Sequence, residues 1–149
     1  MTAELYIKEV EKSPLNGAEA AEVVEEGDFV VTENGGGVRP FDPVADGLPD
    51  GIVPHRERGP HIREHEQDYS EVQYEVGEGP VPFYQFEDGS ELTDLALEAA
   101  EGVEQFEAVA FDADGTVVPA ESEDAETESF GSALQYAAVG EGLHARLGL

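Results

Sequence analysis

The sequence contains no cysteine and no tryptophan, and only two of its 149 residues are lysine. Without cysteine, disulfides, thiolate metal sites and cysteine nucleophiles are excluded. Seven Lys and Arg residues stand against 35 Asp and Glu residues, which gives a formal net charge of -28. Because a nucleic-acid partner requires a basic face for its phosphates, we expect no binding to nucleic acid.

Long apolar runs are also missing. No stretch approaches the roughly 20 apolar residues that span a bilayer, and Met1 is not followed by the basic start and apolar core of a signal peptide. We therefore expect a soluble protein with no membrane partner.

The remaining composition favours a folded domain over disorder. Hydrophobic residues make up 40% of the chain and include 7 Phe and 5 Tyr, which suffice for a small core. The acidic residues are spread along the whole chain, so the surface repels itself in dilute buffer and is well screened at molar salt. This pattern is typical of a halophile. A local acidic patch with its own function is the alternative.

Short apolar stretches separated by Gly and Pro predict a mainly β fold, a small β-barrel or sandwich of short strands. Two parts of the chain are alike. Residues 29–31 and 109–111 are each followed by a glycine-bearing turn and a return strand that ends in proline. A loop comes next, and then a strand that begins with glycine, Gly51 in the first part and Gly131 in the second. Each part predicts a hairpin followed by a third strand.

The sequence also predicts an arm and a helix. Residues 3–10 alternate as in a strand and are followed by a break at 13–17, so we interpret residues 1–17 as an extended N-terminal arm and linker and 18–149 as the barrel domain. Residues 18–26 have the composition of a helical turn. A short helix over about 91–101 is predicted by the capping-box spacing of Asp88 and Glu91 and by the apolar spacing of Leu92, Leu95, Ala96 and Ala99.

A basic loop at residues 55–68 departs from the acidic background. It holds three of the five arginines, Arg56, Arg58 and Arg63, and three of the four histidines. Arginine makes bidentate contacts to carboxylates, so we expect these three to bind an acidic surface of a partner. A metal site at His61 and His65, which stand four residues apart, is the less favoured alternative.

Asp112 and Asp114 follow an apolar stretch at 109–111, as the two catalytic aspartates do in the first motif of haloacid dehalogenase-like phosphatases. In that family Asp112 would be the nucleophile and Asp114 the proton donor. However, only 34 residues follow Gly115 and none is lysine, so the later motifs are missing. A calcium loop is disfavoured because Ala110 occupies its first ligand position. A hairpin turn is the favoured interpretation, and we predict no catalytic, metal or cofactor site.

Several short motifs resemble those of small head-decoration (capsid cement) proteins of tailed viruses. They are a strand beginning Gly-Asp at residues 27–31, a hairpin return at 37–40, the strand at 51–52, and a closing Gly-x-Ala-Leu strand at 131–138 with a terminal strand at 143–147. The acidity would place the virus in a halophilic archaeal host.

The resemblance implies a structural virion protein that is assembled in the host cytoplasm. It would bind the outside of an icosahedral capsid, often as a homotrimer, and stabilise contacts between major capsid subunits. The arm would add a strand to a partner's sheet, with Leu5 and Ile7 on the face toward that partner. We expect a chain lacking residues 1–12 to fold without binding capsids. The alternatives are a turret or tail protein with a similar barrel or, less favoured, a small halophilic phosphatase-like enzyme using Asp112.

Overall fold

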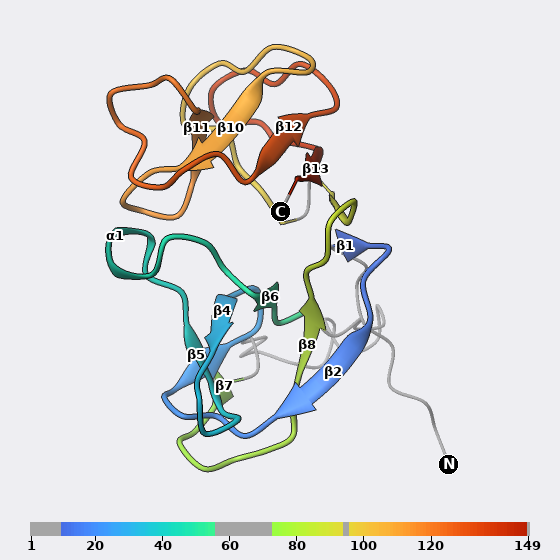
Figure 1. Ribbon diagram of the computed structural model, residues 1–149, viewed down its shortest axis with the longest axis vertical. Helices are drawn as coiled ribbons and strands as arrows, with labels where there is room; N and C mark the ends of the chain where they lie inside the picture. The colour runs from blue at the N-terminus through green and yellow to red at the C-terminus, as the bar shows by residue number, and fades with distance from the viewer. Residues whose placement is uncertain (1–9, 56–72, 94–95, 149) are drawn as a thin grey trace, which may run out of the picture.

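The computed structural model describes residues 10–55, 73–93 and 96–148. The fold is mainly β, as the sequence predicts, and its described strands form sheets of six, five and two strands. In Figure 1 the five-stranded sheet occupies the lower half of the molecule, and the strands near the C-terminus occupy the upper half.

The strands are short, which the frequent glycines and prolines of the sequence explain. The five-stranded sheet has the order β2-β8-β6-β4-β5 and consists of β2 (Leu15–Ala18), β4 (Phe29–Thr32), β5 (Val38–Pro40), β6 (Gly51–Ile52) and β8 (Val81–Gln85). The six-stranded sheet has the order β1-β9-β13-β12-β10-β11 and consists of β1 (Val10–Glu11), β9 (Glu91–Leu92), β10 (Ala108–Phe111), β11 (Val117–Pro119), β12 (Gly131–Ala133) and β13 (Ala145–Leu147). The third sheet pairs β3 (Val24–Glu25) with β7 (Gln73–Tyr74).

The two large sheets repeat one strand arrangement. We name residues 15–85 the first repeat and residues 91–147 the second repeat. Val30 of β4 pairs with a proline on β5 and with Gly51 on β6. Val109 of β10 pairs in the same way with a proline on β11 and with Gly131 on β12. The predicted hairpins and their third strands are therefore confirmed, in identical register.

The repeat extends beyond the hairpins. The sequence Glu-Ala-Ala-Glu occurs at 19–22 and 98–101, and Val-Gly-Glu-Gly occurs at 76–79 and 139–142. Ala20 forms a parallel bridge with Val38, and Ala99 forms one with Val117. The main chains of 76–79 and 139–142 then hydrogen-bond to Ala20 and Ala99, respectively. The chain is thus a tandem duplication of one β module.

The helix predicted at 91–101 is wrong. Glu91 and Leu92 form strand β9, and Ala99 pairs with β11 on one side and hydrogen-bonds to Gly140 and Glu141 on the other. At Ala99 the main chain is hydrogen-bonded on both sides to segments distant in the sequence, and this tertiary context overrides the helix propensity of the apolar spacing. The helical turn considered at 18–26 is likewise replaced by a bridge at Ala20 and by strand β3.

The described residues contain one short helix, α1 (Pro43–Asp46), inside a segment that the sequence predicts as a loop. Asp42 caps it, since its side chain accepts a hydrogen bond from the Val44 amide, and Pro43 fits the first turn because no amide donor is needed there. At four residues, the helix is too short to show the apolar spacing by which helices are recognised in a sequence.

A cluster of aromatic rings joins the two repeats. Phe111 is fully buried; its ring centroid lies 5.3 Å from that of Phe29, 5.4 Å from that of Phe41 and 4.3 Å from that of Phe130. Phe29 and Phe41 belong to the first repeat, whereas Phe111 and Phe130 belong to the second. Truncating a buried phenylalanine such as Phe111 costs about 3–5 kcal/mol, so this cluster contributes to the cohesion between the repeats.

Residues 10–17, which the sequence assigns to the arm and linker, contribute β1 and most of β2 to the two large sheets. Val10 is fully buried in the core. A deletion of residues 1–12 would therefore remove a core side chain, and the arm is better tested by deleting residues 1–9.

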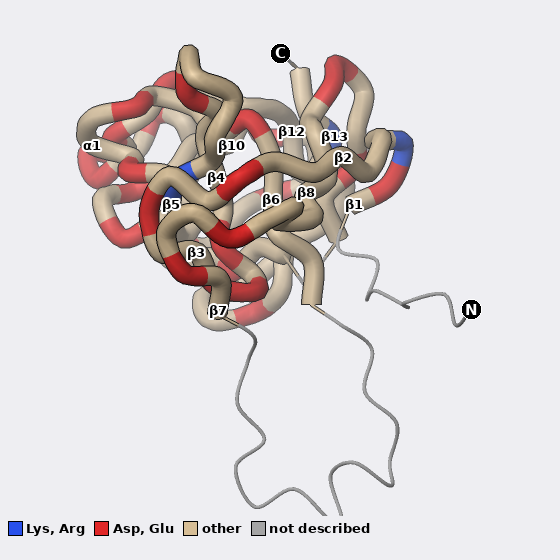
Figure 2. Tube along the Cα trace, turned by 90° about the horizontal axis from the view of Figure 1, so that it is seen from below, with Lys and Arg blue, Asp and Glu red and all other residues tan. Residues whose placement is uncertain are grey.

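Acidic residues lie on the turns and loops of both repeats, whereas Lys and Arg are few (Figure 2). The described cations are Lys12, Arg39 and Arg146, and each has an acidic partner. Within the described ranges, no helix is long and apolar enough to cross a membrane.

Candidate functional site

Asp112 lies in the turn between β10 and β11, and both of its oxygens are used by that turn. Oδ1 accepts hydrogen bonds from the amides of Asp114 and Thr116, each at 3.0 Å, and Oδ2 accepts one from the Thr116 hydroxyl at 2.6 Å. Gly115 has a φ of +85°, a conformation that glycine adopts without strain. These contacts support the hairpin-turn interpretation of the motif.

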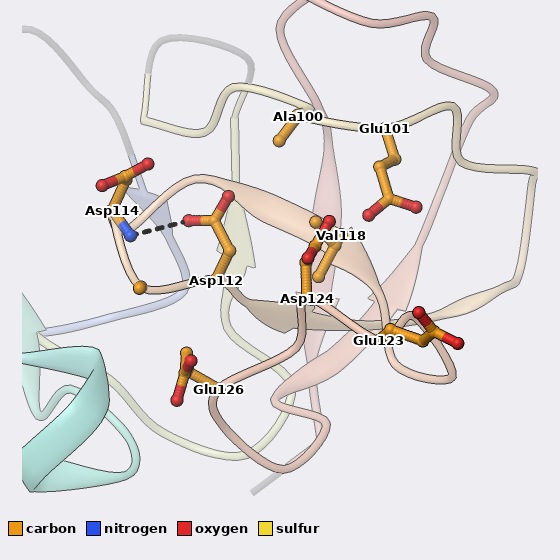
Figure 3. Close-up of a pocket in the computed structure, with 9 residues that line it drawn as sticks. Ala100, Glu101, Asp112, Asp114, Val118, Glu123, Asp124 and Glu126 are labelled. Atoms are coloured by element: carbon orange, nitrogen blue, oxygen red, sulfur yellow. Dashed lines mark hydrogen bonds between the residues drawn. The ribbon is translucent and has the colours of Figure 1, made fainter.

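The turn borders a pocket with an acidic lining (Figure 3). Six carboxylates approach it from three segments: Glu101, Asp112, Asp114, Glu123, Asp124 and Glu126. Among the described residues, no three His, Asp or Glu side chains converge closely enough to hold a metal ion. None of Lys12, Arg39 and Arg146 lines the pocket. A free phosphate at these six carboxylates would meet only negative charge.

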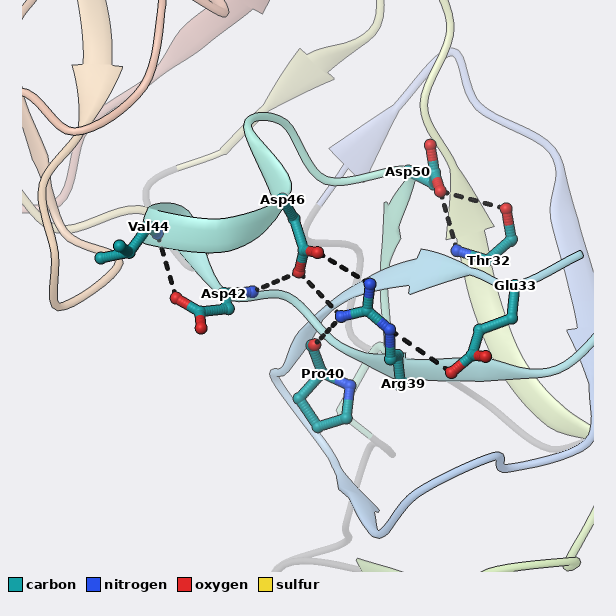
Figure 4. Close-up of polar contacts among 8 residues, drawn as sticks. All are labelled: Thr32, Glu33, Arg39, Pro40, Asp42, Val44, Asp46 and Asp50. Carbon is teal, nitrogen blue, oxygen red and sulfur yellow. Dashed lines mark hydrogen bonds and ion pairs between the residues drawn. The ribbon is translucent and has the colours of Figure 1, made fainter.

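Arg39 is the centre of a polar network on the first repeat (Figure 4). Its Nη1 and Nη2 donate to the two carboxylate oxygens of Asp46 at 2.8 and 2.7 Å, and its Nε lies 3.3 Å from Glu33. The hydrogen bond from Arg39 holds the pKa of Asp46 below its usual value of 3.8. Asp46 also accepts from the Asp42 amide at 2.8 Å, so the network ties α1 to strand β5.

A second ionic cluster lies where β1, β9 and β13 meet. Glu91 pairs with Lys12 at 2.9 Å and with Arg146 at 3.2 Å. The hydrogen bond from Lys12, followed by that from Arg146, holds the pKa of Glu91 below its usual value of 4.5. Two of the three described cations thus stabilise an edge of the six-stranded sheet, a role that their sequence context did not suggest.

Phe106 is an exposed aromatic residue with an unusual backbone. Its side chain is 72% exposed and its φ is +68°, a left-handed conformation that costs an L-residue roughly 1–2 kcal/mol. The equivalent residue of the first repeat is Gly27, which has a φ of +88°. Both amides donate to the carbonyl of an equivalent residue, Gly27 to Val53 and Phe106 to Ala133. The second repeat thus carries an aromatic side chain where the turn favours glycine.

The residues that the sequence predicts for partner binding lie outside the described residues. These are Leu5 and Ile7 of the arm and Arg56, Arg58 and Arg63 of the basic loop, together with His61 and His65. The lengths of the two repeats can nevertheless be compared at this point. Val24 pairs with Tyr74 as Val103 pairs with Ala137, so residues 54–73 of the first repeat correspond to only 134–136 of the second. Residues 54–73 therefore include an insertion that the second repeat lacks.

Comparisons with known proteins point to one kind of structure. No protein-family model matches the chain, and no curated protein matches it either. A solved structure described as the head fiber gp8.5 N base of bacteriophage phi29 is similar, with a TM-score of 0.51 and 13% sequence identity. The similarity covers 90% of this chain and 92% of that one. Both repeats are therefore included, and the chain has the fold of a phage head fiber base.

Proposed function

We propose that the chain is a structural virion protein that binds the outside of an icosahedral capsid and stabilises contacts between major capsid subunits. The observation that carries this proposal is the similarity of nearly the whole chain, including both repeats, to the base of a phage head fiber. The motifs that resemble capsid cement proteins support the same location. They lie on strands that the structure contains, at 29–32, 38–40, 51–52 and 131–133.

The physical properties of the described surface support a binding role over a catalytic one. The carboxylate oxygens of Asp112 accept hydrogen bonds within its own turn, and none of the described residues that line the adjacent pocket is Lys or Arg. Phe106 instead exposes an aromatic ring on a costly backbone conformation, a type of outlier that clusters at functional sites. Many copies on a lattice supply avidity, so each contact can be weak.

The finer parts of the proposal concern the N-terminal arm, which precedes the first repeat, and the basic loop at residues 55–68 within it. The arm adds a strand to a capsid subunit, with Leu5 and Ile7 against that partner. Arg56, Arg58 and Arg63 pair with its carboxylates, because an inserted basic loop on an acidic molecule is suited to an acidic neighbour. The protein acts as a homotrimer in a haloarchaeal tailed virus.

Co-sedimentation with empty capsid shells, assembled from the major capsid protein of the same genome, tests this function in molar salt. We expect saturable binding of the full chain and lost or strongly weakened binding of a chain lacking residues 1–9. The deletion stops before the buried Val10, so circular dichroism should show an intact fold. Absence of binding by the full chain would overturn the proposal. A location on a turret or tail is the alternative, and it predicts binding to those parts in place of shells.

A further inference from the structure

The two repeats differ at one sheet edge. In the second repeat the edge strand β9 is covered by β1, which pairs Val10 with Leu92 and Glu11 with Glu91. In the first repeat the equivalent strand is β2, which pairs with β8 as β9 pairs with β13. Among the described residues, no strand pairs with the outer edge of β2. The outer edge of β2 thus has no described partner strand, whereas β1 occupies the equivalent edge of β9 in the second repeat.

The main-chain groups that face this position follow from the ladder. Gln85 donates its amide to the Pro14 carbonyl, just as Leu147 donates to Ser90 in the second repeat. In an antiparallel pair, residues alternate between bonding inward and bonding outward. Leu15 and Gly17 therefore direct their N–H and C=O groups away from β8. Glu91, which corresponds to Leu15, uses the same outward groups to pair with Glu11 of β1.

The side chains of β2 leave this edge open to pairing. Natural sheets protect an edge with charge, proline or a bulge. The opposite edge strand, β5, contains Arg39 and Pro40, whereas Leu15–Ala18 contains neither a charged residue nor proline. Leu15 is 46% exposed and lies opposite Tyr84 of β8. An added strand would find main-chain groups that no described strand pairs with, and an apolar side chain.

The charge of the molecule indicates which kind of segment can bind at the edge of β2. The chain carries a net charge of -28 and Glu19 directly follows β2, so an acidic segment added at this edge would be repelled. An extended segment with an apolar centre and basic or neutral ends fits the edge. Resting on the proposed function, we infer that the outer edge of β2 accepts such a segment of the major capsid protein as an added strand. In this contact the sheet of the chain receives a strand from the capsid protein, whereas in the contact proposed above the N-terminal arm adds a strand to the capsid protein.

A proline at position 15 tests the contact directly. Leu15→Pro removes an outward N–H and places a ring on the edge, while the inward bonds of Pro14 and Asn16 to β8 remain. Leu15→Ala is the matched control, because it shortens the side chain but keeps the N–H. On the empty shells described above, we expect the proline variant to bind at least about tenfold more weakly than the alanine variant, the equivalent of one lost hydrogen bond or more.

Amide hydrogen exchange of the wild-type chain gives a second measurement that does not depend on the folding of a variant. On binding to shells, the amides of Leu15 and Gly17 should gain protection. If wild type binds but these amides gain none, or if a folded Leu15→Pro variant binds as well as Leu15→Ala, the inference is overturned and the proposed function stands. If wild type does not bind shells, the proposed function itself fails. Sedimentation velocity measures whether the free chain forms dimers. If wild type forms a dimer and Leu15→Pro does not, the edge of β2 binds a second copy, and the inference is contradicted.

Discussion

Gly51 and Gly131 occupy the same position in the two repeats, each directly against a carbonyl group of the neighbouring strand. A Cβ atom on Gly51 would lie well under 3.0 Å from the Tyr84 carbonyl oxygen, and one on Gly131 would meet the Arg146 carbonyl in the same way. Both neighbours belong to regular ladders and cannot move aside cheaply. The close approach of strands at these glycines is therefore a property of the duplicated module.

Alanine at either glycine should destabilise the fold by about 1–3 kcal/mol or more, because the added methyl group overlaps main-chain atoms. Gly35→Ala is the control, since no heavy atom lies within 4 Å of the position of its Cβ. Urea unfolding at constant salt measures all three variants. Equal stability of Gly35→Ala and Gly131→Ala would show that the strands separate more easily than this packing implies.

Asp112 should be a structural residue. Asp112→Ala leaves the amides of Asp114 and Thr116 without their acceptor, and we expect a loss of about 1–3 kcal/mol in unfolding free energy. Asp112→Asn keeps one acceptor oxygen and should lose less. In parallel, hydrolysis of p-nitrophenyl phosphate with magnesium at molar salt should not differ between wild type and Asp112→Asn. Magnesium-dependent hydrolysis that Asp112→Asn abolishes would restore the phosphatase alternative.

Glu91 should make stability depend on pH. Its folded pKa lies below the usual 4.5, so its ion pairs stabilise the fold above about pH 4.5, and this stabilisation is lost as the pH falls through the folded pKa. Acidification also relieves repulsion among the other carboxylates, so the difference between wild type and Glu91→Gln is the informative quantity. We expect wild type to be the more stable form at pH 6 and the advantage to shrink toward pH 3. An advantage that is constant with pH would exclude an electrostatic role for Glu91.

Phe106 should be replaceable by glycine without loss of stability. Glycine relieves the left-handed strain of roughly 1–2 kcal/mol, but it also gains freedom in the unfolded chain that offsets about half of this benefit. We expect Phe106→Gly to unfold at the same denaturant concentration as wild type or slightly above it, and Phe106→Ala to gain nothing. A loss of more than about 2 kcal/mol in Phe106→Gly would mean that the exposed ring packs against the fold.

Salt should stabilise the molecule. At 0.1 M salt the Debye length is about 10 Å, so neighbouring carboxylates repel one another, whereas at 1 M it is about 3 Å. With a net charge of -28, we expect the unfolding temperature to rise steadily from 0.1 to 2 M sodium chloride. A near-neutral β protein measured in the same series is the control for general salt effects. An equal rise in both proteins would argue against the halophilic interpretation.

The hairpins were predictable because their signals are local. Glycine-bearing turns and β-branched flanks specify 29–40 and 109–119 wherever the rest of the chain goes. The segment at 91–101 was not predictable in this way, since its apolar spacing fits a helix. Only partners distant in the sequence hold it extended, namely β1 and β13 at residues 91–92 and β11 and residues 140–141 at Ala99. The repeated Glu-Ala-Ala-Glu and Val-Gly-Glu-Gly sequences argue against a helix at 91–101, because the two copies of a duplicated module should have the same structure.

The candidate contact surfaces were only partly predictable. The charge contrast of residues 55–68 is visible in the sequence, and comparison of the repeats adds that residues 54–73 include an insertion. The open edge at β2 was hidden, because Leu15–Ala18 looks like a linker until its pairing with β8 is known. Likewise, the strained backbone of Phe106 follows from its equivalence to Gly27, which only the paired strands reveal.

Electron cryo-microscopy of particles of the virus whose genome encodes the chain tests the virion role most directly. The proposal predicts repeated density on the outer surface of the head that accommodates both repeats, with contacts to more than one major capsid subunit. Particles whose heads carry no such density, or that carry it only on the tail, would contradict it.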